Sequence, residues 1–226
     1  RSYAINGLRR MIKSAYEKYV LPNILNTCCA TKPIDYQRKK IVPNAHGTVL
    51  EIGIGSGLNI PFYEVAQIDK IYGLDPSPEL CDKAITKAEK YKMKIDFLIN
   101  GAEEIKLKSK SIDTVLITYT LCSIPNPADA LIEIKRVMRS DAKILFCEHG
   151  IAPDIKVSKW QNRINPLWSK LFGGCNINRD IPEILLNSGF KIKDLEQMYL
   201  PSTPKIVGYN YWGEASIWIN GEGIMN

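Results

Sequence analysis

The sequence predicts one α/β domain built on a doubly wound parallel sheet, with a helical extension in front of it. From Thr48 onward, short apolar runs alternate with helix-like segments, which is typical of parallel strands buried on both faces and joined by right-handed crossovers. The composition agrees with this, because 226 residues with 45% hydrophobic and 24% charged side chains are typical of one soluble globular domain. No apolar stretch reaches the length of a membrane-spanning helix.

The extension, residues 1–45, is expected to hold two basic helices. Over residues 4–21, apolar side chains recur at spacings of three and four with Lys and Arg between them, and Pro22 is expected to end or bend this helix. A second short helix is expected over about Asp35 to Ile41 and stops before Pro43. Residues 1–40 hold nine basic and two acidic side chains, whereas the rest of the chain is close to neutral. A neutral body argues against a nucleic-acid partner.

The body, residues 46–226, is expected to follow a strand–helix alternation and to end differently. Strands are predicted at Thr48–Ile52, Ile71–Leu74, Ile95–Ile99, Thr114–Thr118 and Ile144–Cys147, and helices at about 58–66, 77–91, 126–139 and 180–188. Residues 150–180 form an insert after the fifth strand. Lys191–Tyr199 and Val207–Ile219 then resemble two strands with only turn-rich Pro201–Pro204 between them. An antiparallel pair at one edge of the sheet is therefore expected.

The six cysteines are scattered, no Cys-x-x-Cys occurs, and the chain has two histidines. This pattern predicts reduced, intracellular thiols and no metal site.

A glycine-rich turn ends the first strand of the body. Glu51-Ile-Gly53-Ile-Gly55-Ser-Gly57 lets the backbone turn tightly and approach a nucleotide-like ligand. It is neither a dinucleotide fingerprint, because Leu58 takes the place of the third glycine, nor a phosphate-binding P-loop. Asp75 ends the second strand, where a carboxylate can accept both hydroxyls of a ribose or cap the helix that follows.

Together with Gly101-Ala-Glu103 and the strand Asp113–Thr118, these motifs resemble class I S-adenosylmethionine-dependent methyltransferases of the type 11 family, over about residues 47–150. The resemblance implies S-adenosylmethionine as cofactor, S-adenosylhomocysteine as product, and a seven-stranded sheet of order 3-2-1-4-5-7-6 with strand 7 antiparallel. In that family the glycine loop contacts the methionine part, the acid after strand two binds the ribose, and the residues after strand three reach the adenine. The cofactor residues so implied are Glu51, Gly53, Gly55, Gly57, Asn59, Asp75, Pro76, Ser77, Gly101, Ala102, Glu103, Thr118, Tyr119 and Leu121.

A closer likeness lies in the second half of the chain. It rests on the motifs Leu121-Cys-Ser-Ile-Pro-Asn126, Glu148-His-Gly150, Trp160-Gln, Pro166-Leu-Trp168, Gly174-Cys-Asn176, Arg179 and Tyr209-x-Tyr-Trp-Gly213. These look like a bacterial branch of small-molecule methyltransferases whose mammalian members are membrane-associated and methylate alkyl thiols. The resemblance implies a small, hydrophobic acceptor: a thiol first, a phospholipid amine second, a quinol-type carbon or oxygen third. A non-catalytic cofactor-binding scaffold and a nucleic-acid methyltransferase are the alternatives.

Methyl transfer mainly needs alignment and exclusion of water, so no metal is required, but a thiol acceptor must lose its proton. His149 is the candidate base, and Glu148 orients it or is itself the base; alternatively, His149 only shapes the pocket. The acceptor pocket is expected from Cys122, Trp160, Trp168, Cys175 and Arg179, although the aromatic insert can equally just cover the sheet. Cys122 is expected to line the pocket rather than attack.

The N-terminal helix has three interpretations. It packs on the sheet as a solvated helix, touches anionic lipid as a peripheral contact of a cytoplasmic protein, or closes over the cofactor.

Overall fold

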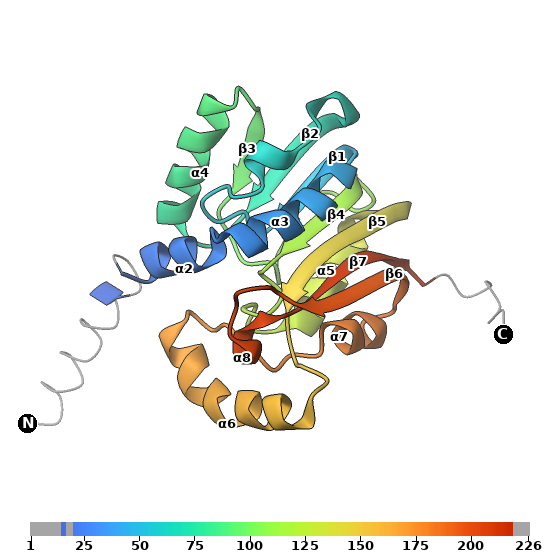
Figure 1. Ribbon diagram of the computed structural model, residues 1–226. Coiled ribbons are helices and arrows are strands. Elements are labelled where there is room, and N and C mark those ends of the chain that lie inside the picture. Colours follow the sequence, from blue (N-terminus) through green and yellow to red (C-terminus); the bar gives the residue numbers. More distant parts are fainter. Residues whose placement is uncertain (1–14, 17–19, 219–226) are drawn as a thin grey trace, which may run out of the picture.

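The computed structural model describes residues 15–16 and 20–218, and its centre is one mixed sheet (Figure 1). The helix predicted over residues 4–21 therefore lies almost wholly outside the described residues. In the described chain the sheet has seven strands in the order β3-β2-β1-β4-β5-β7-β6. Neighbours among the first five strands are parallel, and β7 runs antiparallel to both β5 and β6. The expected strand order and the antiparallel final pair are confirmed. The strands are β1 Gly47–Ile52, β2 Ile68–Leu74, β3 Ile95–Leu98, β4 Ile112–Thr118, β5 Met138–His149, β6 Phe190–Tyr199 and β7 Tyr209–Ile217.

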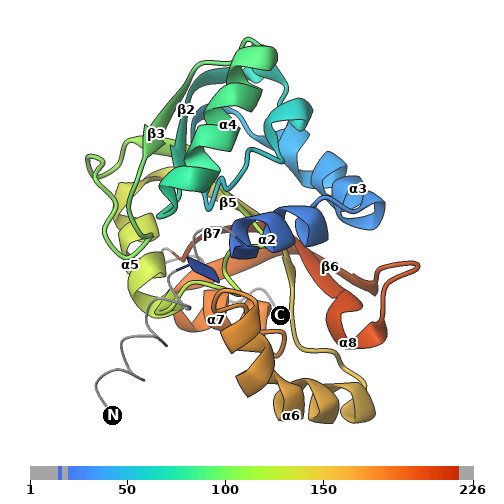
Figure 2. The ribbon, with the colours of Figure 1, turned by 90° about the vertical axis from the view of Figure 1, so that its left-hand side faces the viewer.

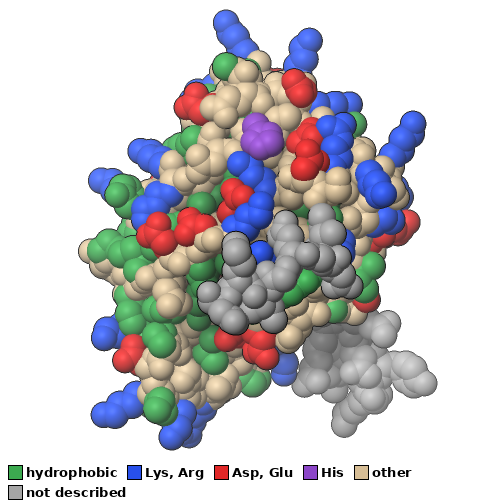
Figure 3. All heavy atoms as spheres, turned by 90° about the vertical axis from the view of Figure 1, so that its right-hand side faces the viewer, with side chains coloured by type: hydrophobic (Ala, Val, Ile, Leu, Met, Phe, Trp, Pro, Cys, Tyr) green, Lys and Arg blue, Asp and Glu red, His purple; other side chains and the backbone are tan. Residues whose placement is uncertain are grey.

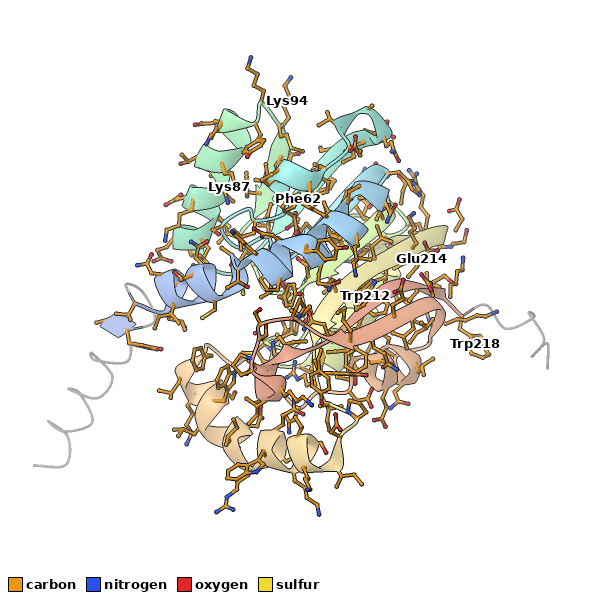
Figure 4. All side chains as sticks on the ribbon, in the orientation of Figure 1. Phe62, Lys87, Lys94, Trp212, Glu214 and Trp218 are labelled. Carbon is orange, nitrogen blue, oxygen red and sulfur yellow. The ribbon has the colours of Figure 1, made fainter. Side chains whose placement is uncertain are left out.

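Helices cover both faces of the sheet. They are α2 Leu21–Cys29, α3 Lys32–Ile41, α4 Pro78–Lys90, α5 Pro127–Val137, α6 Ile155–Leu171, α7 Ile181–Asn187 and the short α8 Lys205–Gly208, with 3₁₀ turns η2 Val42–Asn44, η3 Ile60–Phe62 and η4 Val65–Gln67. Leu131 of α5 and Leu185 of α7 are fully buried in the larger core cluster on one face. On the other face, Ile41 of α3 packs in a cluster with Trp212 of β7, which lies below α3 in Figure 4. None of these helices combines the length and hydropathy needed to cross a bilayer.

Three local predictions were wrong or incomplete. The helix expected at 58–66 is replaced by turns and 3₁₀ helices, because the backbone is extended at Tyr63, whose buried side chain donates to Glu51. Pro22 lies in the first turn of α2, where proline is tolerated, and the helix that it was expected to end or bend lies almost wholly outside the described residues. β5 starts at Met138 and runs for 12 residues. The segment expected to hold only a turn before the last strand contains the four-residue α8.

The insert contains the 17-residue helix α6, which stands apart from the sheet at the bottom of Figures 1 and 2. Gln161 attaches this helix to the body and is fully buried. Its Nε2 donates to the carbonyls of Gly150 (3.0 Å) and Ile177 (2.9 Å), and its Oε1 accepts from Ala152 N (2.9 Å). The insert is thereby held at the end of β5, next to the cavity described below.

Charges are mixed on the side of the molecule that Figure 3 shows, where blue and red side chains alternate. Lys143 and Lys193 both approach Glu214 at 3.9 Å. This side therefore presents no continuous field of one sign.

Candidate active site

A cavity of about 420 Å³ lies at the carboxyl ends of β1, β2 and β4. This is where open parallel sheets bind their ligands. Helix α2 forms part of its wall through Leu21, Pro22, Asn26 and Cys29. Most of the residues implied for the cofactor line it: Glu51, Gly53, Gly55, Asp75, Pro76, Ser77, Gly101, Ala102, Glu103, Thr118 and Tyr119. Gly57, Asn59 and Leu121 do not.

The glycine loop shapes the floor of the cavity. Gly55 has φ +54°, and a Cβ placed on it would meet only the carbonyl of Gly53, at 3.9 Å, so the space above it is open. Gly57 has a different role, because its Cβ would meet Ile60 at 2.5 Å and Ala84 of α4 at 3.2 Å. One glycine therefore leaves room for a ligand, and the other allows the loop to pack against α4.

Asp75 links the glycine loop to the start of α4. Its Oδ2 accepts from Gly55 N at 3.0 Å and its Oδ1 from Ser77 N at 2.9 Å. The helix cap is Ser77, whose hydroxyl accepts from Leu80 N. Burial raises the pKa of Asp75, and the two backbone N–H groups oppose that shift. Each carboxylate oxygen keeps a further lone pair that can accept from a ribose hydroxyl.

Sequence reasoning missed Arg38, a buried cation in the cavity wall. Arg38 comes from α3 and is only 3% exposed. Its Nη1 donates to Asn59 Oδ1 (2.7 Å) and Thr118 Oγ1 (2.9 Å), whereas its Nε has no partner among the described residues. Asn59 also donates to Glu51 Oε1 at 2.8 Å. In the sequence Arg38 sits in a run with Lys39, which is exposed, and nothing in that pattern separates the two.

Glu51 is the acidic member of this network. Burial raises its pKa to about 7, while hydrogen bonds from Tyr63 and Asn59 and the charge of Arg38 act in the opposite direction. Tyr63 Oη donates to Glu51 Oε2 at 2.6 Å. With a pKa of about 7, Glu51 is only partly ionised near neutral pH and offsets the charge of Arg38 incompletely, which leaves Arg38 available for an anionic group of a ligand.

Glu148 fixes the loop that leaves β4. Its Oε1 accepts from the N–H groups of Thr120 (2.5 Å) and Leu121 (2.9 Å), and its Oε2 accepts from that of Cys122 (3.4 Å). The side chain is fully buried and does not line the cavity. Its oxygens accept from backbone donors, so Glu148 positions the loop, and its role as a base stays a prediction.

His149 lies one layer behind the cavity wall. Its ring stacks on Tyr119 with centroids 6.4 Å apart, and its Nε2 is 3.3 Å from Cys175 Sγ. Its Nδ1 is buried and has no hydrogen-bond partner among the described residues. The role of His149 as a base stays a prediction.

The residues expected to form an acceptor pocket separate into two groups. Cys122, Cys175 and Trp168 gather in one apolar cluster, in which Trp168 stacks on Phe172 at 4.0 Å. Trp160 is 56% exposed on α6, so its placement in the pocket was wrong: the helix turns that side chain away from the body. Arg179 donates to the carbonyl of Leu121 and thus supports the β4 loop instead of lining the cavity.

Comparison with known proteins identifies the family. The profile of a family described as "Methyltransferase domain" matches residues 50–146. The human protein "Thiol S-methyltransferase TMT1B" is 31% identical over 185 residues, which cover 76% of this chain and 75% of that protein. Its rat counterpart is 31% identical over 171 residues, covering 71% and 69%. The chain belongs to the family of S-adenosylmethionine-dependent methyltransferases.

A solved structure of this fold contains the cofactor. A geranyl diphosphate methyltransferase in complex with S-adenosylmethionine superposes with a TM-score of 0.63 at 12% identity, covering 82% of this methyltransferase and 85% of that chain. The cavity fits the same cofactor by its own chemistry. It offers an open glycine floor at Gly55, a carboxylate for ribose at Asp75 and, in its wall, the positive charge of Arg38 for a carboxylate.

Proposed function

We propose that this methyltransferase transfers the methyl group of S-adenosylmethionine to the sulfur of a small, hydrophobic thiol. The observation that carries the proposal is the relationship, over about three quarters of the chain, to proteins named thiol S-methyltransferases. The reaction class follows from the family, and the identity of the acceptor is the proposed part.

The surroundings of the cavity suit such an acceptor. Cys29 of α2, Tyr119 and Gly173 line it. The apolar cluster contains Cys122, three residues after Tyr119, and Cys175, two residues after Gly173. Beside Cys29, the cavity has an apolar side formed by Leu21, Pro22, Ile124 and Pro125. It favours an acceptor whose reacting atom is soft and whose body is apolar.

The residues of the chain have distinct tasks in this reaction. When bound, S-adenosylmethionine supplies a methyl group on a sulfonium sulfur. Asp75 and Arg38 are assigned to its ribose and carboxylate, which fixes the direction in which the methyl group points. Tyr119, held at φ +55° at the end of β4, forms the wall at the transfer point. Helix α2 covers the cavity, and Ser56 Oγ donates to Asn26 Oδ1 of that helix at 2.5 Å. This contact helps to exclude water from the transfer.

The test is a competition among acceptors that differ in one atom. The protein is incubated with S-adenosylmethionine and an alkyl thiol, or with the alcohol or amine of the same chain length, and the products are identified by mass spectrometry. We expect S-adenosylhomocysteine and a methyl thioether with the thiol only. Methylation of the amine, of phosphatidylethanolamine, of a quinol precursor or of RNA, with the thiol unchanged, would refute the proposal.

A further inference from the structure

Three metal-binding side chains meet beside the transfer site although they are far apart in the sequence. They are Cys122 in the loop after β4, His149 at the end of β5 and Cys175 after α6. Their ligand atoms all lie within 4.8 Å of one another. Cys122 and Cys175 are 2% and 8% exposed. The sequence shows no metal-binding spacing, so only the fold reveals this group.

One distance within the group is close to that between two ligands of a tetrahedral ion, and the others do not exceed 4.8 Å. With Zn–S near 2.3 Å and Zn–N near 2.0 Å, tetrahedral angles place a nitrogen and a sulfur ligand about 3.5 Å apart and two sulfurs about 3.8 Å apart. Cys175 Sγ and His149 Nε2 are 3.3 Å apart. The remaining pairs must close by at most about 1 Å to reach tetrahedral spacing.

The backbone around the group is tied together by buried hydrogen bonds. Asn176 N and Nδ2 both donate to the carbonyl of Cys122, at 2.9 and 3.2 Å, which joins the segments of the two cysteines. The carboxylate of Glu148, adjacent to His149, accepts from Cys122 N at 3.4 Å. These bonds hold the segments that carry the ligands, whereas Nδ1 of His149 has no hydrogen-bond partner among the described residues.

We propose that Cys122, His149 and Cys175 bind a Zn²⁺ ion whose fourth coordination position is open to an external thiol. Two thiolates and an imidazole are ligands that Zn²⁺ favours, and a site with three protein ligands keeps one position for water or substrate. No fourth Cys, His, Asp or Glu within the described chain joins the group. The cavity borders it, because Ser123 and Gly173 line the cavity and Ser123 Oγ lies 3.5 Å from Cys122 Sγ.

The thiol part of this inference rests on the proposed function. An acceptor thiol that takes the fourth position releases its proton to solvent and becomes a thiolate. Its sulfur forms the new bond to the methyl carbon while the bond from that carbon to the sulfonium sulfur breaks. The electron pair of the broken bond stays on the cofactor sulfur, which leaves neutral S-adenosylhomocysteine and a methyl thioether. The thioether is uncharged and binds Zn²⁺ less strongly than the thiolate did.

The metal itself is tested first, with no methyl transfer involved. The full chain is reduced with a phosphine, stripped with a chelator and titrated with Co²⁺, which reports thiolate ligation by charge-transfer absorption; Zn²⁺ content is measured by mass spectrometry. We expect one ion per chain. Cys122→Ser, Cys175→Ser and His149→Gln should each weaken binding by more than about 100-fold, because even second-layer changes cost 10- to 100-fold. Cys81→Ser, which alters a buried thiol outside the group, should bind as wild type does.

The results separate this inference from the proposed function. The site would be overturned if folded wild-type protein showed no thiolate-to-Co²⁺ absorption. It would also be overturned if Cys81→Ser lost as much Co²⁺ affinity as the variants of the three ligands. An alkyl thiol added without S-adenosylmethionine should change the Co²⁺ spectrum, whereas the matched alcohol should not; no response to the thiol would overturn the open position. Undiminished thiol methylation by zinc-free protein would contradict the inference and leave the function standing. If Co²⁺ binds and its spectrum responds to the thiol but no thiol is methylated, the metal site stands and the proposed function is refuted.

Discussion

Replacing Arg38 with Met is expected to weaken S-adenosylmethionine binding by about 10- to 100-fold. The guanidinium is buried, is held by Asn59 and Thr118, and belongs to a residue that lines the cavity, so its charge can attract the carboxylate of the cofactor. A hydrogen bond to a charged group contributes about 1.5 to 3 kcal/mol, and each 1.4 kcal/mol is tenfold in Kd. Isothermal titration calorimetry measures the change directly. A Kd within about threefold of wild type in folded protein would refute the assignment, because that difference is below 1 kcal/mol.

Two further variants isolate the role of the buried charge. Arg38→Lys keeps the charge but not the planar fork, so its affinity should fall between those of wild type and Arg38→Met. Lys39→Met removes the same charge one residue later, from an exposed position on α3, and should leave the affinity unchanged. Thermal denaturation of all three variants checks that they are folded. Equal losses in Lys39→Met and Arg38→Met would mean that only the net charge of α3 matters.

Four other changes test separate parts of the structure. Asp75→Ala should abolish cofactor binding in equilibrium dialysis, and unchanged affinity would remove Asp75 from the ribose site. Because burial raises the pKa of Glu51 to about 7, the stability contributed by its protonated form is complete below pH 4.5 and is lost as the pH rises through 7. Glu51→Gln should therefore flatten the decline of Tm of the cofactor-free protein across that window, and an identical pH profile would contradict the shift. Trp160→Ala should leave thiol turnover unchanged, since the side chain points to solvent from α6; a large loss of kcat would restore it to the acceptor site. Gln161→Ala should lower the free energy of unfolding in urea by at least about 3 kcal/mol, because several buried backbone groups lose their partner. A change below 1 kcal/mol would show that water replaces the side chain.

Much of the fold could be predicted because its signals are local. Strands such as Thr114–Thr118 are continuous apolar runs, and a strand buried on both faces needs nothing else. The glycine turn and Asp75 were recognisable for the same reason, since their positions at strand ends follow from the strands themselves. The order of the strands came from the family resemblance, because pairing between distant segments leaves no trace in a single sequence.

The parts that were missed depend on tertiary contacts. Whether a basic residue of α3 is buried is decided by the sheet beneath it, which is why Arg38 looked like its exposed neighbour Lys39. The acidic residue at the end of β5 looked like a catalytic group, yet Glu148 satisfies backbone N–H groups of a loop almost thirty residues earlier. Trp160 and Trp168 lie on one helix and had equal claims to the pocket, until the attachment of α6 through Gln161 determined which of them faces the body.

The loop after β4 connects the two chemical parts of this protein. Tyr119 and Thr120 line the cofactor cavity, and two residues after Thr120, Cys122 belongs to the apolar cluster that also contains Cys175. The single carboxylate of Glu148 holds the N–H groups of Thr120 and Cys122, so neither side of the loop can shift without changing the same set of hydrogen bonds. If a bound cofactor changes the affinity of Cys122, His149 and Cys175 for their ligand, thermodynamic linkage requires that ligand to change the affinity for the cofactor by the same factor. Glu148 therefore contributes by keeping the methyl donor and the group of Cys122, His149 and Cys175 in one fixed relation, a role in which alignment matters more than acid–base strength.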